Sequence, residues 1–97
     1  MKKINTAVVG ATGAVGREML KILEEKDFPV NKLKLFATER SKGKKLKFKG
    51  EEYEVDTIKA GSFSDIDIAL FSIGSTPSKE IVPKAVKEGA IAIDNSN

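Results

Sequence analysis

Two spacings of hydrophobic residues recur along this chain, and each predicts one type of element. Continuous apolar runs indicate buried strands, whereas apolar residues three or four positions apart indicate amphipathic helices. We therefore expect strands at Ile4–Val9, Lys32–Ala37, Ile68–Phe71 and Ile91–Ile93. We expect a helix at Ala14–Lys26, with an apolar stripe of Val15, Met19, Ile22 and Leu23. A second helical segment begins at Ser75 and stops by Gly89, with a stripe of Ile81, Val82, Ala85 and Val86.

Three local patterns refine this outline. Residues alternate along Lys45–Lys49 and Glu51–Val55 around Gly50, which predicts a short β-hairpin. The unbroken apolar run Ile68–Phe71 is typical of a parallel strand that is buried on both faces. Pro83 should kink the second helical segment or divide it into two short helices, because proline removes a helix hydrogen bond.

The order of the elements predicts the fold class. Strand–helix–strand, hairpin, then strand–helix–strand indicates an α/β protein with a Rossmann-type doubly wound parallel sheet and a short β-hairpin insertion. The predicted parallel strands fall short of the roughly six in a full dinucleotide-binding sheet. The last strand ends at the sheet edge where ligands bind in such folds, so we expect residues 1–97 to form one truncated domain, a fragment of a longer protein.

A glycine-rich turn, G-x-x-G-x-x-G, joins the first strand to the first helix. Gly10 permits the tight turn, Gly13 lets a pyrophosphate approach the backbone, and Gly16 lets the helix pack closely on the strand. The free N–H groups and the positive end of the helix dipole would face the phosphates. We therefore expect a dinucleotide ligand; the alternative is a structural turn that binds nothing.

The loop after the second strand bears on the choice of cofactor. An acidic residue here, such as Glu39, often holds the ribose 2′-hydroxyl of NAD, whereas an arginine accommodates the 2′-phosphate of NADP. Arg40, with the hydroxyls of Thr38 and Ser41, suits a phosphate, so we favour NADP and expect Glu39 to point away. The alternative is a solvated charged loop.

Composition and charge exclude several function classes. The net charge is only +3, and the lysines of 42–49 alternate with apolar residues without an aromatic stacking platform, so we expect a solvated hairpin face and no nucleic-acid binding. The sequence contains no apolar run of about 18 residues and no signal peptide, which favours a cytoplasmic protein without membrane contact. It contains no Cys and no His, so we expect neither an ordinary metal site nor a Cys–His or Ser–His catalytic pair.

Taken together, these features resemble the amino-terminal part of bacterial aspartate-semialdehyde dehydrogenases. The matching segments span nearly the whole chain in the family's order: Val8–Glu18, Phe28–Val30, Ala37–Gly43, Asp67–Ser72, Ser78–Glu80, Pro83–Val86 and Ile93–Ser96. The N-acetyl-glutamyl-phosphate reductases share the glycine turn, but match the 38–43 loop and the Ser78–Glu80 run less well.

The resemblance implies an NADP-dependent oxidoreductase that converts aspartyl-4-phosphate to aspartate semialdehyde in lysine, threonine and methionine biosynthesis. It implies that the pyrophosphate is cradled by Thr12, Gly13, Ala14 and Val15. It implies that the 2′-phosphate is held by Thr38, Arg40 and Ser41. Further contacts along the cofactor and toward its nicotinamide would come from Ser72, Gly74, Thr76 and Asn95.

The resemblance covers only the cofactor half of the family's machinery. The family's catalytic Cys and His, and its substrate-phosphate Arg, lie beyond Asn97, and Asn97 itself stands where the family usually has a second Ser. We therefore expect no turnover by these 97 residues alone, and a parent protein that forms a homodimer or larger assembly. The alternatives are a non-catalytic nucleotide-binding module, a reductase-like fragment, or a structural fragment that holds no cofactor and self-associates through an open sheet edge.

Overall fold

A computed structural model describes residues 3–95, except for the side chains of Ser75 and Thr76. The strands are β1 (Ile4–Val9), β2 (Val30–Phe36), β3 (Lys45–Phe48), β4 (Glu51–Asp56), β5 (Ile68–Phe71) and β6 (Ile91–Asp94). The helices are α1 (Ala14–Glu25), α2 (Ser75–Lys87) and the short 3-10 helix η1 (Glu39–Ser41). The strands and helices expected from the sequence are therefore present, with bounds that match or differ by one or two residues at their ends.

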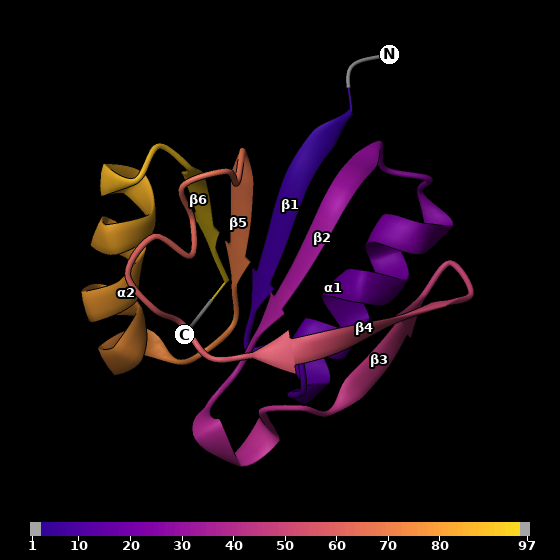
Figure 1. Cartoon of the computed structure of the whole chain (residues 1–97), viewed down its shortest axis with the longest axis horizontal. Helices are drawn as coiled ribbons and strands as arrows, with labels where there is room; N and C mark the ends of the chain where they lie inside the picture. Colours follow the sequence, from indigo (N-terminus) through magenta and orange to yellow (C-terminus); the bar gives the residue numbers. More distant parts are fainter. Residues whose placement is uncertain (1–2, 96–97) are drawn as a thin grey trace.

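The six strands form one sheet in the order β3-β4-β2-β1-β5-β6 (Figure 1). All neighbouring strands run parallel except β3, which is antiparallel to β4. The doubly wound α/β sheet is confirmed. Five of the six strands are parallel, so the parallel set still falls short of six, but by one strand less than expected, because β4 pairs parallel with β2 through Leu35–Val55 and Phe36–Asp56. The hairpin therefore extends the main sheet and supplies one of its parallel strands.

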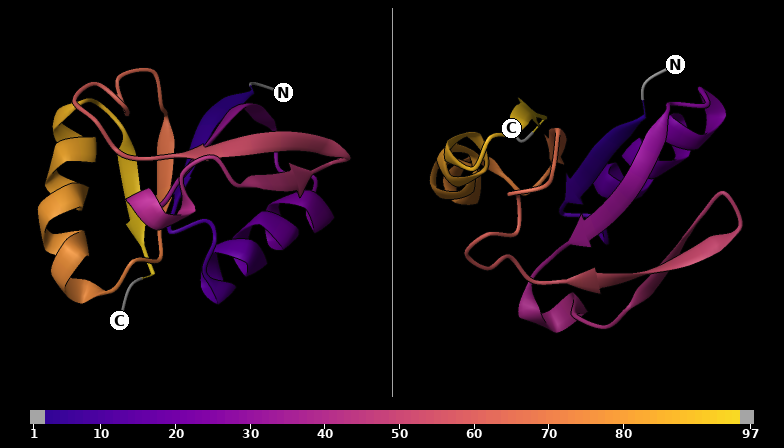
Figure 2. Two further views of the ribbon diagram at one scale, coloured as in Figure 1. Left: turned by 60° about the horizontal axis from the view of Figure 1, so that its bottom comes forward. Right: turned by 45° about the horizontal axis from the view of Figure 1, so that its top comes forward.

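The two helices cover opposite faces of the sheet, as the views in Figure 2 show. Along β1, Val8 packs with Leu20 and Leu23 of α1. Its neighbour Val9 faces the other way and packs in the cluster that contains Ala85 of α2. This alternation follows from the strand period of two residues and places a separate apolar core on each face.

Three phenylalanine rings fill the core on the α2 side. The Phe63 ring lies 5.5 Å from the Phe36 ring and 6.1 Å from the Phe71 ring, measured between centroids. Phe63 comes from the loop between β4 and β5 and is fully buried. The carboxylate of Glu88 accepts hydrogen bonds from the backbone N–H groups of Gly61 and Phe63, so this loop is fixed against the end of α2.

Helix α2 is one continuous helix, and the expectation that Pro83 divides it is wrong. Proline removes a single helical N–H, and the exposed Pro83 ring lies on the solvent side, where it does not disturb the packing on the sheet. Within the described residues, neither this helix nor any other is long and apolar enough to cross a membrane.

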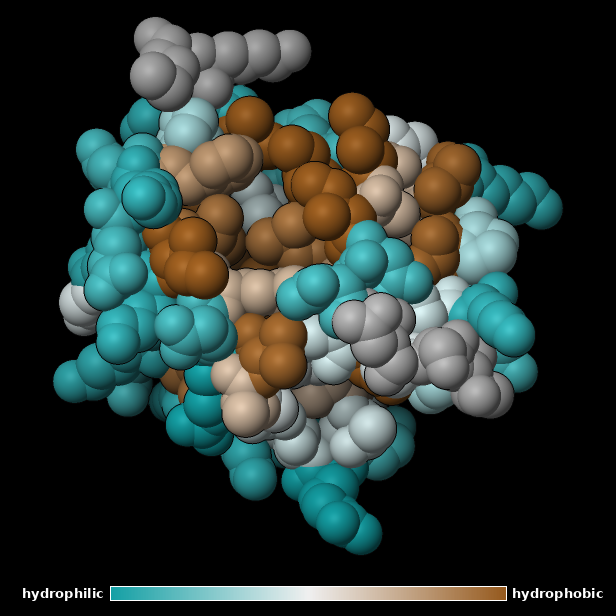
Figure 3. All heavy atoms as spheres, turned by 180° about the vertical axis from the view of Figure 1, so that it is seen from behind, coloured by the Kyte–Doolittle hydropathy of each residue, from teal (hydrophilic) through white to brown (hydrophobic). Residues whose placement is uncertain are grey.

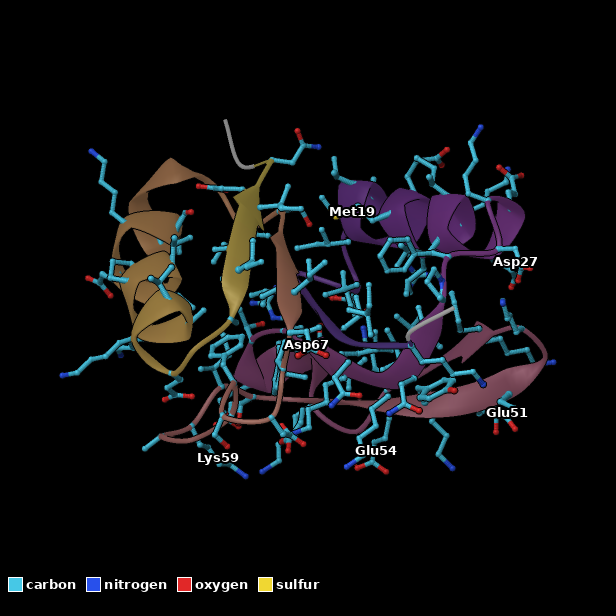
Figure 4. The ribbon with its side chains drawn as sticks, turned by 90° about the horizontal axis from the view of Figure 1, so that it is seen from above. Met19, Asp27, Glu51, Glu54, Lys59 and Asp67 are labelled. Atoms are coloured by element: carbon cyan, nitrogen blue, oxygen red, sulfur yellow. The ribbon has the colours of Figure 1, made fainter. Side chains whose placement is uncertain are left out.

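The α1 side of β5 and β6 is open to solvent. Ala69 and Phe71 are buried beneath α2, whereas Ile68 and Leu70 on the opposite face are only partly buried. The exposed hydrophobic residues on and near this face include Val15, Ile22, Ile91 and Ile93. Figure 3 shows this apolar surface, and Figure 4 places Met19 on the flank of α1 beside it. The expected burial of β5 on both faces is therefore wrong, because α1 covers β1 and β2 but does not reach across β5 and β6. For the same reason, Val15 and Ile22 of the apolar stripe on α1 stay half exposed.

Candidate functional site

A cavity of about 510 Å³ lies where the parallel strands end. Its walls come from the carboxyl ends of β1, β2, β4 and β5 and from the first turns of α2. The lining residues are Val9, Gly10, Thr12, Gly13, Ala37, Thr38, Glu39, Thr57, Ile58, Ser72, Ile73, Pro77 and Ile81. This is the position where open α/β sheets bind ligands, beside the switch between β1 and β5, and the volume is in the usual range for small-molecule sites.

The backbone of the glycine turn is held tightly against the sheet. The N–H groups of Gly10 and Ala11 both donate to the Phe36 carbonyl oxygen, at 2.8 and 3.1 Å. Gly10 has φ +88°, a conformation that favours glycine. A Cβ atom on Gly16 would lie 2.1 Å from the Gly10 carbonyl oxygen, so α1 approaches β1 too closely for any other residue. The roles expected for Gly10 and Gly16 in the turn are confirmed.

The start of α1 presents unpaired backbone donors. Gly13 is the N-cap in an extended conformation, and it supplies no capping side chain. The N–H groups of Ala14, Val15 and Gly16, in the first helical turn, have no partner earlier in the helix. Gly13, Ala14 and Val15 are exposed, whereas Gly16 is buried, so an anion can reach the Ala14 and Val15 donors and the positive end of the helix dipole.

Two contacts tie the glycine turn to its surroundings through Thr12. Its hydroxyl lies 3.0 Å from that of Ser41 in η1, and either oxygen can donate. Its carbonyl oxygen accepts a hydrogen bond of 3.1 Å from Arg17 Nε. The structure thus brings together the two sequence segments, 10–16 and 38–41, that were expected to bind phosphate groups.

The residues of η1 and its N-cap Thr38 differ in where they lie relative to the cavity. Thr38 and Glu39 are among the residues that line the cavity, and both are exposed. Arg40 is exposed and is not among the lining residues. Ser41 is buried, 8% exposed, because its side chain turns inward to Thr12.

The remaining expected site residues lie at the ends of β5 and β6. The Ser72 hydroxyl lies 3.4 Å from the Val9 carbonyl oxygen, between two strand ends. Gly74, with φ +88°, is the N-cap of α2. The Asn95 N–H donates to the Phe71 carbonyl oxygen at 2.8 Å, and Asn95 is exposed. The side chain of Thr76 lies outside the described part of the chain.

A carboxylate lies next to the cavity at the end of β4. The Thr57 N–H donates to Asp56 Oδ1 at 2.8 Å. This hydrogen bond is the main cause that holds the pKa of Asp56 below its ordinary value, with the charges of Lys59 and Lys42 adding to it. Asp56 therefore stays anionic near neutral pH, and its carboxylate is already bound to the backbone.

Sequence reasoning missed the apolar part of the cavity. Ile58, Ile73, Pro77 and Ile81 line it beside Thr57. Thr57 and Ile58 follow β4 directly, and treating that strand as a neighbour of β2 would have pointed to them, since the carboxyl ends of parallel strands meet at one edge. Ile73 and Pro77 lie among the residues expected to follow the cofactor, but their apolar side chains carried no signal of their own.

Comparison with known proteins gives consistent results. Residues 5–97 match the family model described as semialdehyde dehydrogenase, NAD binding domain. The chain is 59% identical over 92 residues to aspartate-semialdehyde dehydrogenase of Aquifex aeolicus, covering 94% of this chain and 27% of that protein. It is 49% identical over 94 residues to the protein of the same name from Bacillus subtilis, covering 97% of this chain and 27% of that protein.

A solved structure has the same fold over nearly all of this chain. Aspartate semialdehyde dehydrogenase II of Vibrio cholerae, in complex with ASA, superposes with a TM-score of 0.95 at 43% identity. The match covers 99% of this chain and 29% of that one. The chain therefore spans less than a third of the length of these relatives.

Proposed function

Because this chain belongs to the semialdehyde dehydrogenase NAD-binding-domain family, we propose that it is the NADP-binding part of an aspartate-semialdehyde dehydrogenase. The observation that carries this proposal is the cavity at the carboxyl ends of the parallel strands, with the glycine turn and η1 on its rim. The match to a nicotinamide-dinucleotide-binding family supports the class of ligand.

The pyrophosphate would lie against the start of α1. We assign its binding to the N–H groups of Ala14 and Val15 and to the Thr12 hydroxyl, because these donors lie together at a helix N-terminus. Gly13 is exposed and has no side chain, so it leaves room for a phosphate to approach the backbone. The apolar wall formed by Ile58, Ile73, Pro77 and Ile81 suits a flat ring of the same ligand.

The choice between NADP and NAD depends on η1. We propose that Arg40, with Thr38 and Ser41, holds the 2′-phosphate of NADP, because a guanidinium group binds phosphate oxygens in pairs. Glu39 lines the cavity and favours the alternative, a bond from its carboxylate to the 2′-hydroxyl of NAD. The two residues are neighbours, so substituting each in turn separates the two possibilities.

Calorimetric titration of the chain with NADP and with NAD tests this assignment. Arg40→Ala should weaken NADP by about 1.5–3 kcal/mol, the value of a charge-assisted hydrogen bond, and leave NAD nearly unchanged. Glu39→Ala is the matched control and should not weaken NADP. Equal losses for both cofactors in Arg40→Ala would contradict the specificity assignment. A folded chain that binds neither dinucleotide would contradict the proposed function itself.

The chemistry of the whole protein is also part of the proposal. The cofactor would supply hydride for reductive dephosphorylation of aspartyl-4-phosphate, with its nicotinamide near Ser72, Gly74, Thr76 and Asn95. The chain contains no Cys and no His, so we expect no turnover by these 97 residues alone. We further propose that the protein works in the cytoplasm and as a homodimer or larger assembly.

A further inference from the structure

The peptide bond between Thr12 and Gly13 is fixed at both ends, and a side chain supplies one of the two contacts. Its N–H, on Gly13, donates to the Gly10 carbonyl oxygen at 3.2 Å. Its carbonyl oxygen, on Thr12, accepts from Arg17 Nε at 3.1 Å. Arg17 belongs to α1 and is exposed, so packing in the core does not force its side chain into this contact.

The orientation of this peptide matters for an anion. If it rotated, the Thr12 carbonyl oxygen could turn toward the site where a phosphate would lie, and two negative groups would face each other. A peptide bond next to glycine rotates easily, because glycine adopts positive and negative φ values about equally readily. A bond from a side chain on the rigid helix to this carbonyl oxygen therefore stabilises the orientation that accepts an anion.

We propose that Arg17 is a positioning residue for dinucleotide binding, acting through the Thr12 carbonyl oxygen on the conformation of the glycine turn. This inference rests on the function proposed above and adds a residue that the glycine pattern does not contain. Because the pyrophosphate is common to both cofactors, Arg17 should affect NADP and NAD equally, in contrast to Arg40.

Two substitutions separate the hydrogen bond from the positive charge. In Arg17→Gln, the side-chain nitrogen is the same number of bonds from Cα as Arg Nε, so a donor remains in place without the charge. In Arg17→Lys, a methylene group occupies that place and the charge lies beyond it. Arg17→Met removes both, and Lys21→Met, one turn further along α1, is the control for loss of a nearby charge.

The experiment is titration of the full 97-residue chain and its variants with NADP and NAD, with thermal melting to confirm folding. We expect Arg17→Met to raise both dissociation constants by about three- to tenfold, the value of one hydrogen bond. Arg17→Gln should bind nearly as the original chain does, Arg17→Lys should resemble Arg17→Met, and Lys21→Met should have little effect. Binding retained in Arg17→Lys but lost in Arg17→Gln would overturn the proposal, because charge alone would then explain it.

Amide hydrogen exchange in the free chain provides a readout that does not require cofactor. Arg17→Met should accelerate exchange of the Gly13 amide, while amides in the centre of the sheet remain protected as before. Unchanged exchange at Gly13 would overturn the proposal. If the original chain bound neither dinucleotide, the proposed function would fail, and the Gly13 exchange would still decide whether Arg17 holds the turn.

Discussion

Gly16 and Gly13 lie in the same turn, and the structure predicts opposite consequences for the same substitution. A Cβ atom on Gly16 would meet three backbone atoms, at 2.1 Å from the Gly10 carbonyl oxygen and at 2.8 Å from both Gly10 C and Ala11 Cα. These atoms belong to a turn that is hydrogen-bonded to β2, so they cannot move aside cheaply. A Cβ atom on Gly13 would meet only the Gly10 carbonyl oxygen, at an ordinary 3.5 Å.

The expected cost of Gly16→Ala follows from two opposing effects. Overpacking against well-ordered atoms costs about 1–3 kcal/mol, and contact with three backbone atoms places this case at the upper end. In the opposite direction, alanine stabilises a helix by about 1 kcal/mol relative to glycine. We therefore expect a net loss of about 2 kcal/mol in the free energy of unfolding, which lowers the melting temperature of a domain of this size by roughly 8–16 °C.

Gly13→Ala should change stability by less than about 1 kcal/mol, because alanine is a poorer N-cap but restricts the unfolded chain. Its methyl group would instead occupy the exposed side of the turn and weaken dinucleotide binding. Urea denaturation and calorimetric titration of both variants test the pair. A Gly16→Ala chain as stable as the original would refute the close-approach argument, and undiminished binding in Gly13→Ala would refute the pyrophosphate assignment.

Three further outcomes follow from the packing and the hydrogen bonds. Phe63→Leu should cost about 1–2 kcal/mol in urea denaturation, because the fully buried ring contacts two others; a loss below about 0.5 kcal/mol would contradict its place in the core. The hydrogen bond from Lys34 holds the pKa of Asp65 below its ordinary 3.8. Ionised Asp65 therefore stabilises the folded chain fully above pH 3.8, and this contribution to the free energy of unfolding is lost as the pH falls through the lower pKa of the folded chain. Asp65→Asn should remove that part of the pH dependence, measured as unfolding free energy at about pH 3 and about pH 6. Ser41→Ala should cost about 1 kcal/mol, and combining it with Thr12→Val should cost less than the two single losses together, since both remove the same hydrogen bond; strict additivity would exclude that coupling.

The elements that sequence reasoning predicted correctly depend on local signals. The glycine turn is specified by residues that meet one another within a few positions, and Gly16 is buried against Gly10 as its spacing requires. The hairpin around Gly50 follows from strict alternation, which places Phe48 inside and the lysines outside. Such patterns need no knowledge of the rest of the fold.

The features that it missed depend on which element lies beside which. Nothing within Glu51–Asp56 indicates that this strand pairs with β2, and so Ile58 was not expected at the cavity. The periodicity of α1 places Val15 on the apolar stripe of the helix. Val15 nevertheless stays half exposed, because the sheet is wider than the area that one helix can cover. Phe63 is one aromatic residue in a polar loop, and its burial depends on rings that come from two different strands.

The choice between NADP and NAD depends on both local sequence and packing, and both act within the three residues of η1. The sequence of η1 contains both an acidic and a basic residue. Either one would decide between NAD and NADP if it alone faced the ligand. The backbone of η1 directs Ser41 inward to Thr12, which leaves Glu39 on the cavity side and Arg40 exposed. An exposed arginine has a long, flexible side chain that can reach a phosphate at the rim, whereas a carboxylate on the cavity side opposes that phosphate by charge. Preference for NADP therefore requires Arg40 to outweigh Glu39, and for this reason paired substitution of the two residues is more informative than either substitution alone.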